Sequence, residues 1–429
     1  MTLGLPVEKI SSMDFPFKNV QAFTGLAYFM SAIMISTTYH KIRKLATSIP
    51  VTTLGKNPPL AIQDAVQNVE VLKAPVSMTA IAALDYHGQL QTILACFARS
   101  LIPNPVVMHD REVLELDDGG HVALDWLSLP AEKAASATAS LQPWCPSSPV
   151  VIMCHGLCGS SESDYIVHTA EQFLLHGYRV AVLIARGCAG LPLNTPVGFS
   201  GARTSDIKAA AELVSKRFPN SKVCSIGYSL GAGILMNYVG NHEDVPLAAA
   251  CCVCPPWDMR HAEPTSVFPV WSFVLSLALK GYIWSNRNML SAPTDPVVDL
   301  WAVLLAPSVR DIDQQIVHMH GYDDVDSYYK SMSSAYVAKH VTVPTLAISA
   351  EDDPCCTIHG CPDMNHHVSD HHSHNCELDA ESNRSENLGN GLVVVRTAIG
   401  GHLGYLESLL NPRADWTDKA ALQWFDQFR

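Results

Sequence analysis

A glycine–serine–glycine turn is the segment whose residue types and spacing are best suited to chemistry. An apolar stretch, Lys222–Gly227, leads through Ser229 to Gly231 and a second apolar stretch that resembles a helix. This order predicts a sharp strand-to-helix turn, with the serine hydroxyl exposed above a sheet on a strained backbone. The amide of Leu230 would then lie at the helix N-terminus, where it can stabilise an oxyanion. The same pattern also occurs as an ordinary glycine-rich turn, so its partners decide the interpretation.

A serine hydroxyl is a weak nucleophile that needs a base, and the base needs an orienting carboxylate. For this type of turn the order along the chain is serine, acid, histidine. Asp352 and Asp353 follow the strand-like stretch Thr345–Ser349, and His402 follows Leu392–Ala398. In open α/β sheets, ligands bind at the carboxyl ends of the strands, which is where all these groups fall. The sequence therefore predicts a serine–acid–histidine triad in which the two aspartates compete for the role of the acid.

An oxyanion site requires a second backbone donor besides the amide of Leu230. The apolar stretch Val150–Cys154 is followed by the sequence His155-Gly-Leu157. A His-Gly turn after an early strand of such a sheet can supply this donor. We therefore assign it to the amide of Leu157; the alternative is a plain strand-to-helix loop.

Strand-like and helix-like stretches alternate from residue 149 onward, which is typical of a mostly parallel, twisted sheet with helices on both faces. A turn signal at Asp117–Gly120 predicts a hairpin over Arg111–Leu127 that adds an antiparallel edge. The predicted strands are Val150–Cys154, Arg179–Ile184, Lys222–Gly227, Ala248–Cys254, Thr345–Ser349 and Leu392–Ala398. The predicted helices are Tyr165–His176, Ser205–Arg217, Leu230–Val239 and Trp416–Phe428.

A long insertion, about residues 255–340, separates two of the predicted strands, Ala248–Cys254 and Thr345–Ser349. It contains the apolar stretch Val267–Leu279, which is too short to span a bilayer comfortably. One interpretation is an apolar lid that shapes an acyl-chain pocket and contacts lipid. The other is a cap helix packed on the core, and the two are compatible.

The composition excludes some functions and favours others. The net charge of −13 argues against nucleic-acid binding, because a basic surface is needed to bind phosphates. Hydrophobic residues make up 48% of the chain and charged residues only 16%, which favours a large core with a membrane contact. The thirteen cysteines show no regular disulfide spacing and are odd in number, which is typical of a reducing compartment.

The N-terminal segment, residues 1–45, contains about twenty residues without a formal charge, at positions 20–39. This length suits a single membrane-spanning helix, and the alternatives are a removed signal peptide or an amphipathic surface helix. Lys41, Arg43 and Lys44 follow it directly, which favours a cytosolic location for the rest of the chain. Residues 46–105 are expected to form a connector, and residues 106–429 a single α/β domain.

A histidine- and cysteine-rich insertion at about residues 355–391 separates Asp353 from His402. Its residue types can bind metals, but their spacing matches no zinc template. It reads either as a surface insertion that loops out or as a structural or regulatory metal site. For the site itself we predict no metal and no cofactor, since a serine triad needs neither.

Twelve segments between about residue 84 and the C-terminus follow the pattern of a known family. They are His87–Thr92, Arg111–Gly120, Leu124–Trp126, His155–Ser161, Tyr165, Ala185–Leu193, Gly227–Leu235, Ser308–Asp313, Tyr328–Tyr329, Pro344–Leu346, Asp352–Pro354 and Gly401–Gly404. In these segments the chain resembles the α/β-hydrolase group that contains the abhydrolase-domain proteins 1, 2 and 3 and their bacterial and plant relatives. One departure is Cys158, which stands where threonine is commoner in this group, and a second is the length of the 355–391 insertion.

The resemblance implies an α/β-hydrolase fold with a cap and a membrane-anchored serine esterase of lipids, such as acylglycerols, phospholipids or medium-chain acyl esters. Carried over residue by residue, it implies Ser229 as nucleophile, Asp353 as acid and His402 as base. Asp353 is preferred to Asp352 because the family spacing counted from Ala350 ends there. An acyltransferase with the same triad is the main alternative, and a catalytically inactive lipid-binding protein is a third.

Overall fold

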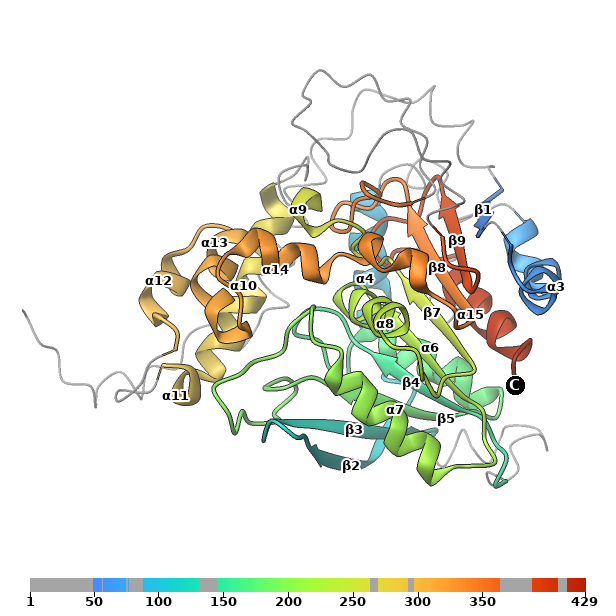
Figure 1. The fold of residues 1–429 in the computed structure, drawn as a ribbon, viewed down its shortest axis with the longest axis horizontal. Helices are drawn as coiled ribbons and strands as arrows, with labels where there is room; N and C mark the ends of the chain where they lie inside the picture. Colours follow the sequence, from blue (N-terminus) through green and yellow to red (C-terminus); the bar gives the residue numbers. More distant parts are fainter. Residues whose placement is uncertain are drawn as a thin grey trace, which may run out of the picture. The chain divides into compact units, whose positions relative to one another are not determined.

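Nine strands form one sheet in the order β1-β9-β8-β7-β6-β4-β5-β3-β2 (Figure 1). The six strands from β9 to β5 run parallel, whereas β1 at one edge and the β2–β3 hairpin at the other are antiparallel. The strands are β1 Val51–Leu54, β2 Val107–Glu115, β3 His121–Ser128, β4 Val150–Cys154, β5 Arg179–Ile184, β6 Val223–Tyr228, β7 Ala249–Val253, β8 Thr345–Ala350 and β9 Leu392–Thr397.

The computed structural model describes residues 49–55, 57–74, 76, 88–130, 145–262, 269–291, 297–362, 388–407 and 415–429. All of them belong to one structural unit, Thr37–Arg429. The predicted membrane anchor at 20–39 lies outside the described residues, as does most of the histidine-rich insertion. None of the helices described is long and apolar enough to cross a membrane.

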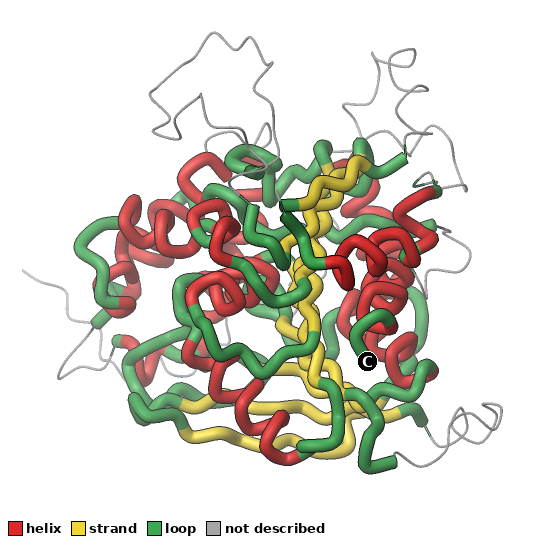
Figure 2. Tube along the Cα trace, turned by 45° about the vertical axis from the view of Figure 1, so that its right-hand side comes forward, coloured by secondary structure: helices red, strands yellow, loops and turns green. Residues whose placement is uncertain are grey.

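Helices cover both faces of the sheet, whose strands turn strongly from one edge to the other (Figure 2). The alternation of side chains along β4 shows the two layers. Val151 and Met153 pack with α6 and α15, whereas Val150 and Ile152 pack with α7 and α8. The covering helices are α3 Leu60–Asn68, α4 Gly88–Ser100, α6 Asp164–Leu175, α7 Ser205–Arg217, α8 Leu230–Asn241 and α15 Trp416–Asp426. Strands buried on both faces are mainly apolar, which is why β4 and β5 read as nearly continuous apolar runs.

The predicted α/β fold is confirmed, and several boundaries agree residue for residue, including those of β4, β5 and α7. The hairpin forms the predicted antiparallel edge. The second antiparallel edge was not anticipated: β1 lies in the expected connector and pairs with β9. The expected connector also contains α3 and α4, and residues of α4 contact the loop that carries His402.

The insertion at 255–340 folds as a series of helices, of which α9 to α14 gather to the left of the sheet in Figure 1. Asp299, Ser308 and Asp324 each accept backbone N–H groups at the starts of three of these helices, as N-cap residues do. The series comprises α9 Met259–Ala262, α10 Pro269–Ser285, α11 Arg287–Leu290, α12 Leu300–Leu305, α13 Val309–Ile316, η5 Val317–His320, α14 Val325–Met332, η6 Ser334–Tyr336 and η7 Ala338–His340. We call this series the cap helices.

Candidate active site

Ser229 sits between the end of β6 and the start of α8, with φ +53° and ψ −120°. A non-glycine residue in this left-handed region is strained, and such strain persists only where the surroundings impose it. The Ser229 N–H donates to the carbonyl of Val253, and its own carbonyl accepts from Ala232 and Gly233. The turn is therefore fixed from both sides, as the sequence predicted.

Two glycines permit this turn because backbone atoms occupy the space that their side chains would fill. A Cβ on Gly227 would lie 2.5 Å from the carbonyl oxygen of Gly231. A Cβ on Gly231 would lie 2.4 Å from the carbonyl oxygens of both Cys154 and His155. The N-terminus of α8 thus rests directly on the end of β4, which brings Ser229 next to the His155–Leu157 loop.

Replacing Gly231 by alanine is expected to lower the free energy of unfolding by about 3 kcal/mol, because a methyl group cannot fit against two backbone oxygens without moving α8. The matched control is Gly281→Ala in α10, where an added Cβ meets no atom within 4 Å. That change should be neutral or stabilise the fold by about 1 kcal/mol through helix propensity. Urea unfolding of both variants tests the expectation, and equal midpoints would contradict it.

The three predicted triad residues lie in one chain of hydrogen bonds. His402 Nε2 is 2.8 Å from Ser229 Oγ, and His402 Nδ1 is 2.9 Å from Oδ2 of Asp353. Because Nδ1 faces a carboxylate, it carries the proton, which leaves Nε2 free to accept the serine O–H. The carboxylate is buried, and the imidazole is only 12% exposed. This is the arrangement in which an imidazole can remove the proton of a serine.

The Asp353 carboxylate is held by its own turn. The backbone N–H groups of Cys355 and Cys356 each donate to Oδ1 at 2.8 Å. Oδ2 is therefore the oxygen left to approach His402 most closely. The long insertion begins within this turn and leaves its geometry intact.

Asp352 does not contact His402 through its side chain in the way that Asp353 does. Its Oδ1 accepts the backbone N–H of Gly401 at 2.8 Å, and its Oδ2 is buried without a hydrogen-bond partner among the described residues. Burial, together with the charge of Asp353, raises the pKa of Asp352 to about 7. The two adjacent aspartates thus have different partners: Asp353 bonds to the imidazole of His402, and Asp352 bonds to the backbone of the loop that carries it.

Replacing Asp352 by asparagine is expected to stabilise the protein at alkaline pH. An unfolded aspartate titrates near pH ~4, so between this value and about 7 the folded chain binds more protons than the unfolded chain. Stability therefore falls as the pH rises through this window, by about 4 kcal/mol at most. An uncharged amide removes this loss. We expect the free energy of unfolding of the variant, relative to the wild type, to be larger at pH 8 than at pH 5. The same difference between variant and wild type at both pH values would refute the expectation.

The loop that carries His402 is supported by α4, in the segment expected to be a connector. The His402 N–H donates to Thr92 Oγ1 at 2.8 Å, and the Arg99 guanidinium donates to the carbonyl of Leu403 at 2.9 Å. A Cβ on Gly401 would lie 2.1 Å from the carbonyl oxygen of Gly88, so the loop and α4 are in close contact. Thr92 falls in one of the segments that carried the family resemblance, but no role was assigned to it or to Arg99 from the sequence.

The loop after β4 brings a second set of backbone groups to Ser229. Gly156 lies against the nucleophile, since a Cβ built on it would be 3.4 Å from Ser229 Cβ. The Gly156 N–H donates to the Tyr165 hydroxyl at 2.9 Å. His155 Nε2 accepts from the Ala185 N–H, so Nδ1 carries the proton and donates to the Gly156 carbonyl at 2.7 Å. Burial lowers the pKa of His155, which favours this neutral form.

A cavity of about 120 Å³ opens beside Ser229, lined by Leu157 and Leu230 from the two predicted oxyanion segments. Most of its wall comes from the cap helices, and α10 contributes one face at helical spacing. The lining residues from α10 are Trp271, Ser272, Leu275, Leu279 and Tyr282; others from the cap include Pro256, Met259, Val309, Asp313, Ile316, Met319, His320, Tyr328, Tyr329 and Met332. The cavity is therefore mainly apolar and suits an acyl chain.

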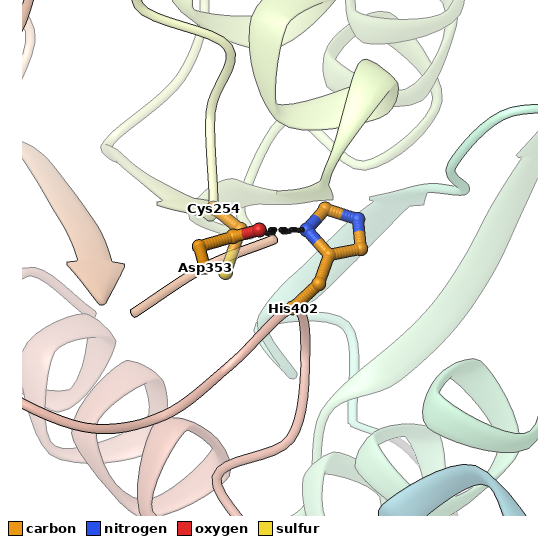
Figure 3. A group of neighbouring side chains, drawn as sticks. All are labelled: Cys254, Asp353 and His402. Carbon is orange, nitrogen blue, oxygen red and sulfur yellow. Dashed lines mark hydrogen bonds and ion pairs between the residues drawn. The ribbon is translucent and has the colours of Figure 1, made fainter. Parts of the chain in front are cut away.

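Metal-ligand side chains also come together at the site. Within the described ranges, Cys254, Asp353 and His402 place ligand atoms within 4.8 Å of one another (Figure 3). Asp353 and His402 already bond to each other, and burial raises the pKa of the Cys254 thiol well above its ordinary value. Asp353 and His402 are already joined to Ser229 by hydrogen bonds, and the Cys254 thiol donates to the carbonyl of Gly401.

Comparison with known proteins agrees with the fold. Residues 149–383 match the family model for the alpha/beta hydrolase fold. The chain is 31% identical to embryogenesis-associated protein EMB8 of Picea glauca, over 79% of this chain and 69% of that protein. It is 26% identical to human phospholipase ABHD3, over 79% of this chain and 76% of that protein. It is 27% identical to monoacylglycerol lipase ABHD2 of Danio rerio, over 86% of this chain and 82% of that protein.

Proposed function

This chain belongs to the α/β-hydrolase superfamily, in the group of the ABHD proteins, and from this premise we propose that it is a serine hydrolase of the carboxylic esters of lipids. The observation that carries the proposal is the hydrogen-bonded chain Asp353–His402–Ser229 at the wall of an apolar cavity. The names of the two ABHD relatives support a lipid ester as substrate.

The proposed mechanism gives each of these groups a role. His402 Nε2 removes the Ser229 proton, and Asp353 holds the imidazole in the required tautomer. Ser229 Oγ attacks the ester carbonyl, and the amides of Leu157 and Leu230 stabilise the resulting oxyanion. His402 then protonates the leaving alcohol, and water activated by the same imidazole releases the fatty acid from Ser229.

Acyl transfer is the alternative outcome of the same acyl-enzyme, with an alcohol in place of water as the acceptor. Product analysis distinguishes the two. In a reaction supplied with ethanol or glycerol, free fatty acid as the main product supports the hydrolase, whereas a new ester as the main product supports the transferase.

Membrane association is also part of the proposal, through the segment at 20–39 and through the cap. Trp301 and Leu305 lie one turn apart on α12 and are 63% and 79% exposed, and Phe273 on α10 is 52% exposed. Exposed apolar side chains near a lipid-binding cavity suit contact with a bilayer. We further propose that the hydrolase unit faces the cytosol. Membrane fractionation of the full chain and of a chain without residues 1–45 tests the membrane association, and a full chain found outside the membrane fraction would refute it. Protease protection tests the orientation, because a hydrolase unit that faces the cytosol is digested from that side.

The central experiment is competitive labelling of the full chain in membranes with a fluorophosphonate probe, which reacts with activated serines. We expect labelling that is blocked by monoacylglycerols, diacylglycerols, lysophospholipids or phosphatidylcholines, and the most effective competitor identifies the lipid class. Absence of labelling in folded protein would refute a serine hydrolase.

A further inference from the structure

His320 is a polar residue of the cavity wall that has no role in the proposed mechanism. It ends the short helix η5 and lines the same cavity as Ser229. Both of its ring nitrogens are buried, and neither has a hydrogen-bond partner among the described residues. A buried polar atom without a partner is costly, so such atoms are commonly satisfied by a ligand or an ordered water.

Other polar groups on the cavity wall differ from His320 in this respect. The Tyr282 hydroxyl donates to the carbonyl of Arg186 at 3.1 Å. The Tyr329 hydroxyl donates to Asp313 Oδ2 at 2.7 Å. Each of these hydroxyls has a partner in the protein, whereas the imidazole of His320 has none within the part of the chain that the structure describes. The wall therefore offers His320 as an available hydrogen-bonding group.

The imidazole is held in place and uncharged. Its ring stacks on Tyr328 with centroids 5.2 Å apart and an interplanar angle of 13°. Burial, with the charge of Arg203 in addition, lowers the pKa of His320 to about 3. A neutral imidazole has one N–H donor and one acceptor nitrogen. The orientation of the ring is thus fixed by Tyr328, and both kinds of hydrogen bond are available.

The charge at this part of the cavity limits the chemistry of the ligand. The imidazole brings no positive charge, and the Asp313 carboxylate lines the same wall. The positive charge of Arg203 also acts on His320, so charges of both signs face this part of the wall. A hydroxyl needs neither charge, because it can donate to one ring nitrogen or accept from the other. An uncharged hydroxyl is therefore the group that fits best.

We propose that His320 forms a polar subsite that hydrogen-bonds an uncharged hydroxyl of the lipid ester, and thereby selects hydroxyl-bearing substrates. The proposal rests on the lipid-esterase function proposed above. The hydroxyl could belong to the alcohol part, as in a partly acylated glycerol, or to a hydroxylated acyl chain.

Two pairs of soluble esters distinguish these sources in the full-length wild-type chain in detergent. The first pair is monohexanoylglycerol and propyl hexanoate, which differ in the hydroxyls of the alcohol. The second pair is ethyl 6-hydroxyhexanoate and ethyl hexanoate, which differ in a hydroxyl of the acyl chain. We expect kcat/KM to favour the hydroxylated member of one pair by about tenfold. Equal values within both pairs would overturn the subsite without requiring any variant.

Variants connect the preference to the residue. His320→Phe keeps an aromatic ring against Tyr328 but removes both nitrogens, and it should abolish the tenfold preference. His320→Gln keeps a donor and an acceptor and should restore part of it. His318→Phe is the matched control, because His318 lies in the same short helix with its side chain exposed; it should leave the preference intact. A preference that survives in His320→Phe would overturn the assignment.

Failure of the subsite and failure of the proposed function give different results. If propyl hexanoate and ethyl hexanoate were hydrolysed as efficiently as their hydroxylated partners, the esterase proposal would stand and the subsite would be rejected. Absence of hydrolysis of all four esters, with no fluorophosphonate labelling, would reject the esterase and the subsite together.

Discussion

Replacing Ser229 by alanine is expected to lower kcat on a soluble lipid ester by about 10⁵-fold or more, because the covalent route through Ser229 Oγ is lost. Covalent labelling by a fluorophosphonate should disappear as well. The substitution removes one oxygen and keeps the Cβ, so the strained turn between β6 and α8 is preserved and the fold should be unaffected. Steady-state kinetics on the purified full chain, with unfolding followed in parallel, measures both effects.

A matched control comes from a second side chain at the same place. Cys356 Sγ lies 3.9 Å from Ser229 Oγ and lines the same cavity, so its thiol is a second potential nucleophile there. Burial raises the pKa of this thiol well above its ordinary value, which disfavours the reactive thiolate. Cys356→Ala should therefore retain probe labelling. The assignment would be overturned if Cys356→Ala lost labelling while Ser229→Ala kept it.

The sequence predicts the parts of this fold that depend on local pattern. Buried parallel strands are apolar runs of defined length, so β4 and β5 could be delimited to the residue. The turn at Ser229 requires glycine at positions 227 and 231 because backbone atoms approach there, and glycine is visible in a sequence. Where a physical requirement selects a residue type, the prediction succeeds.

The parts that could not be predicted depend on contacts between distant segments. β1 pairs with β9 from more than three hundred positions away, and its four residues are too few to form a recognisable strand pattern. The side chains of Thr92 and Arg99 bond to backbone atoms of the His402 loop. Any residue has these backbone atoms, so the loop sequence does not reveal the two contacts. His320 likewise becomes notable only in the folded chain, where neither ring nitrogen has a hydrogen-bond partner in the described ranges. Such roles arise from the packing and not from any local pattern.

Replacing Asp353 by asparagine is expected to lower kcat by about 10⁴-fold at neutral pH, the loss typical of an imidazole held in the wrong tautomer. The structure indicates how the amide would orient. The N–H groups of Cys355 and Cys356 both donate to Oδ1, so the oxygen of an asparagine should occupy that position. Its NH₂ group would then lie where Oδ2 is now, 2.9 Å from Nδ1 of His402.

An NH₂ group at this position donates to Nδ1, which forces the imidazole proton onto Nε2, the nitrogen that must accept from Ser229. The base is therefore lost although the geometry is retained, and this predicts an unchanged fold with slow probe labelling. Asp352→Asn is the matched control: its Oδ1 can still accept the Gly401 N–H, so kcat should fall by less than about tenfold. Equal losses in the two variants would mean that the aspartates act as one unit, whereas a large loss only in Asp352→Asn would transfer the role of the acid to that residue.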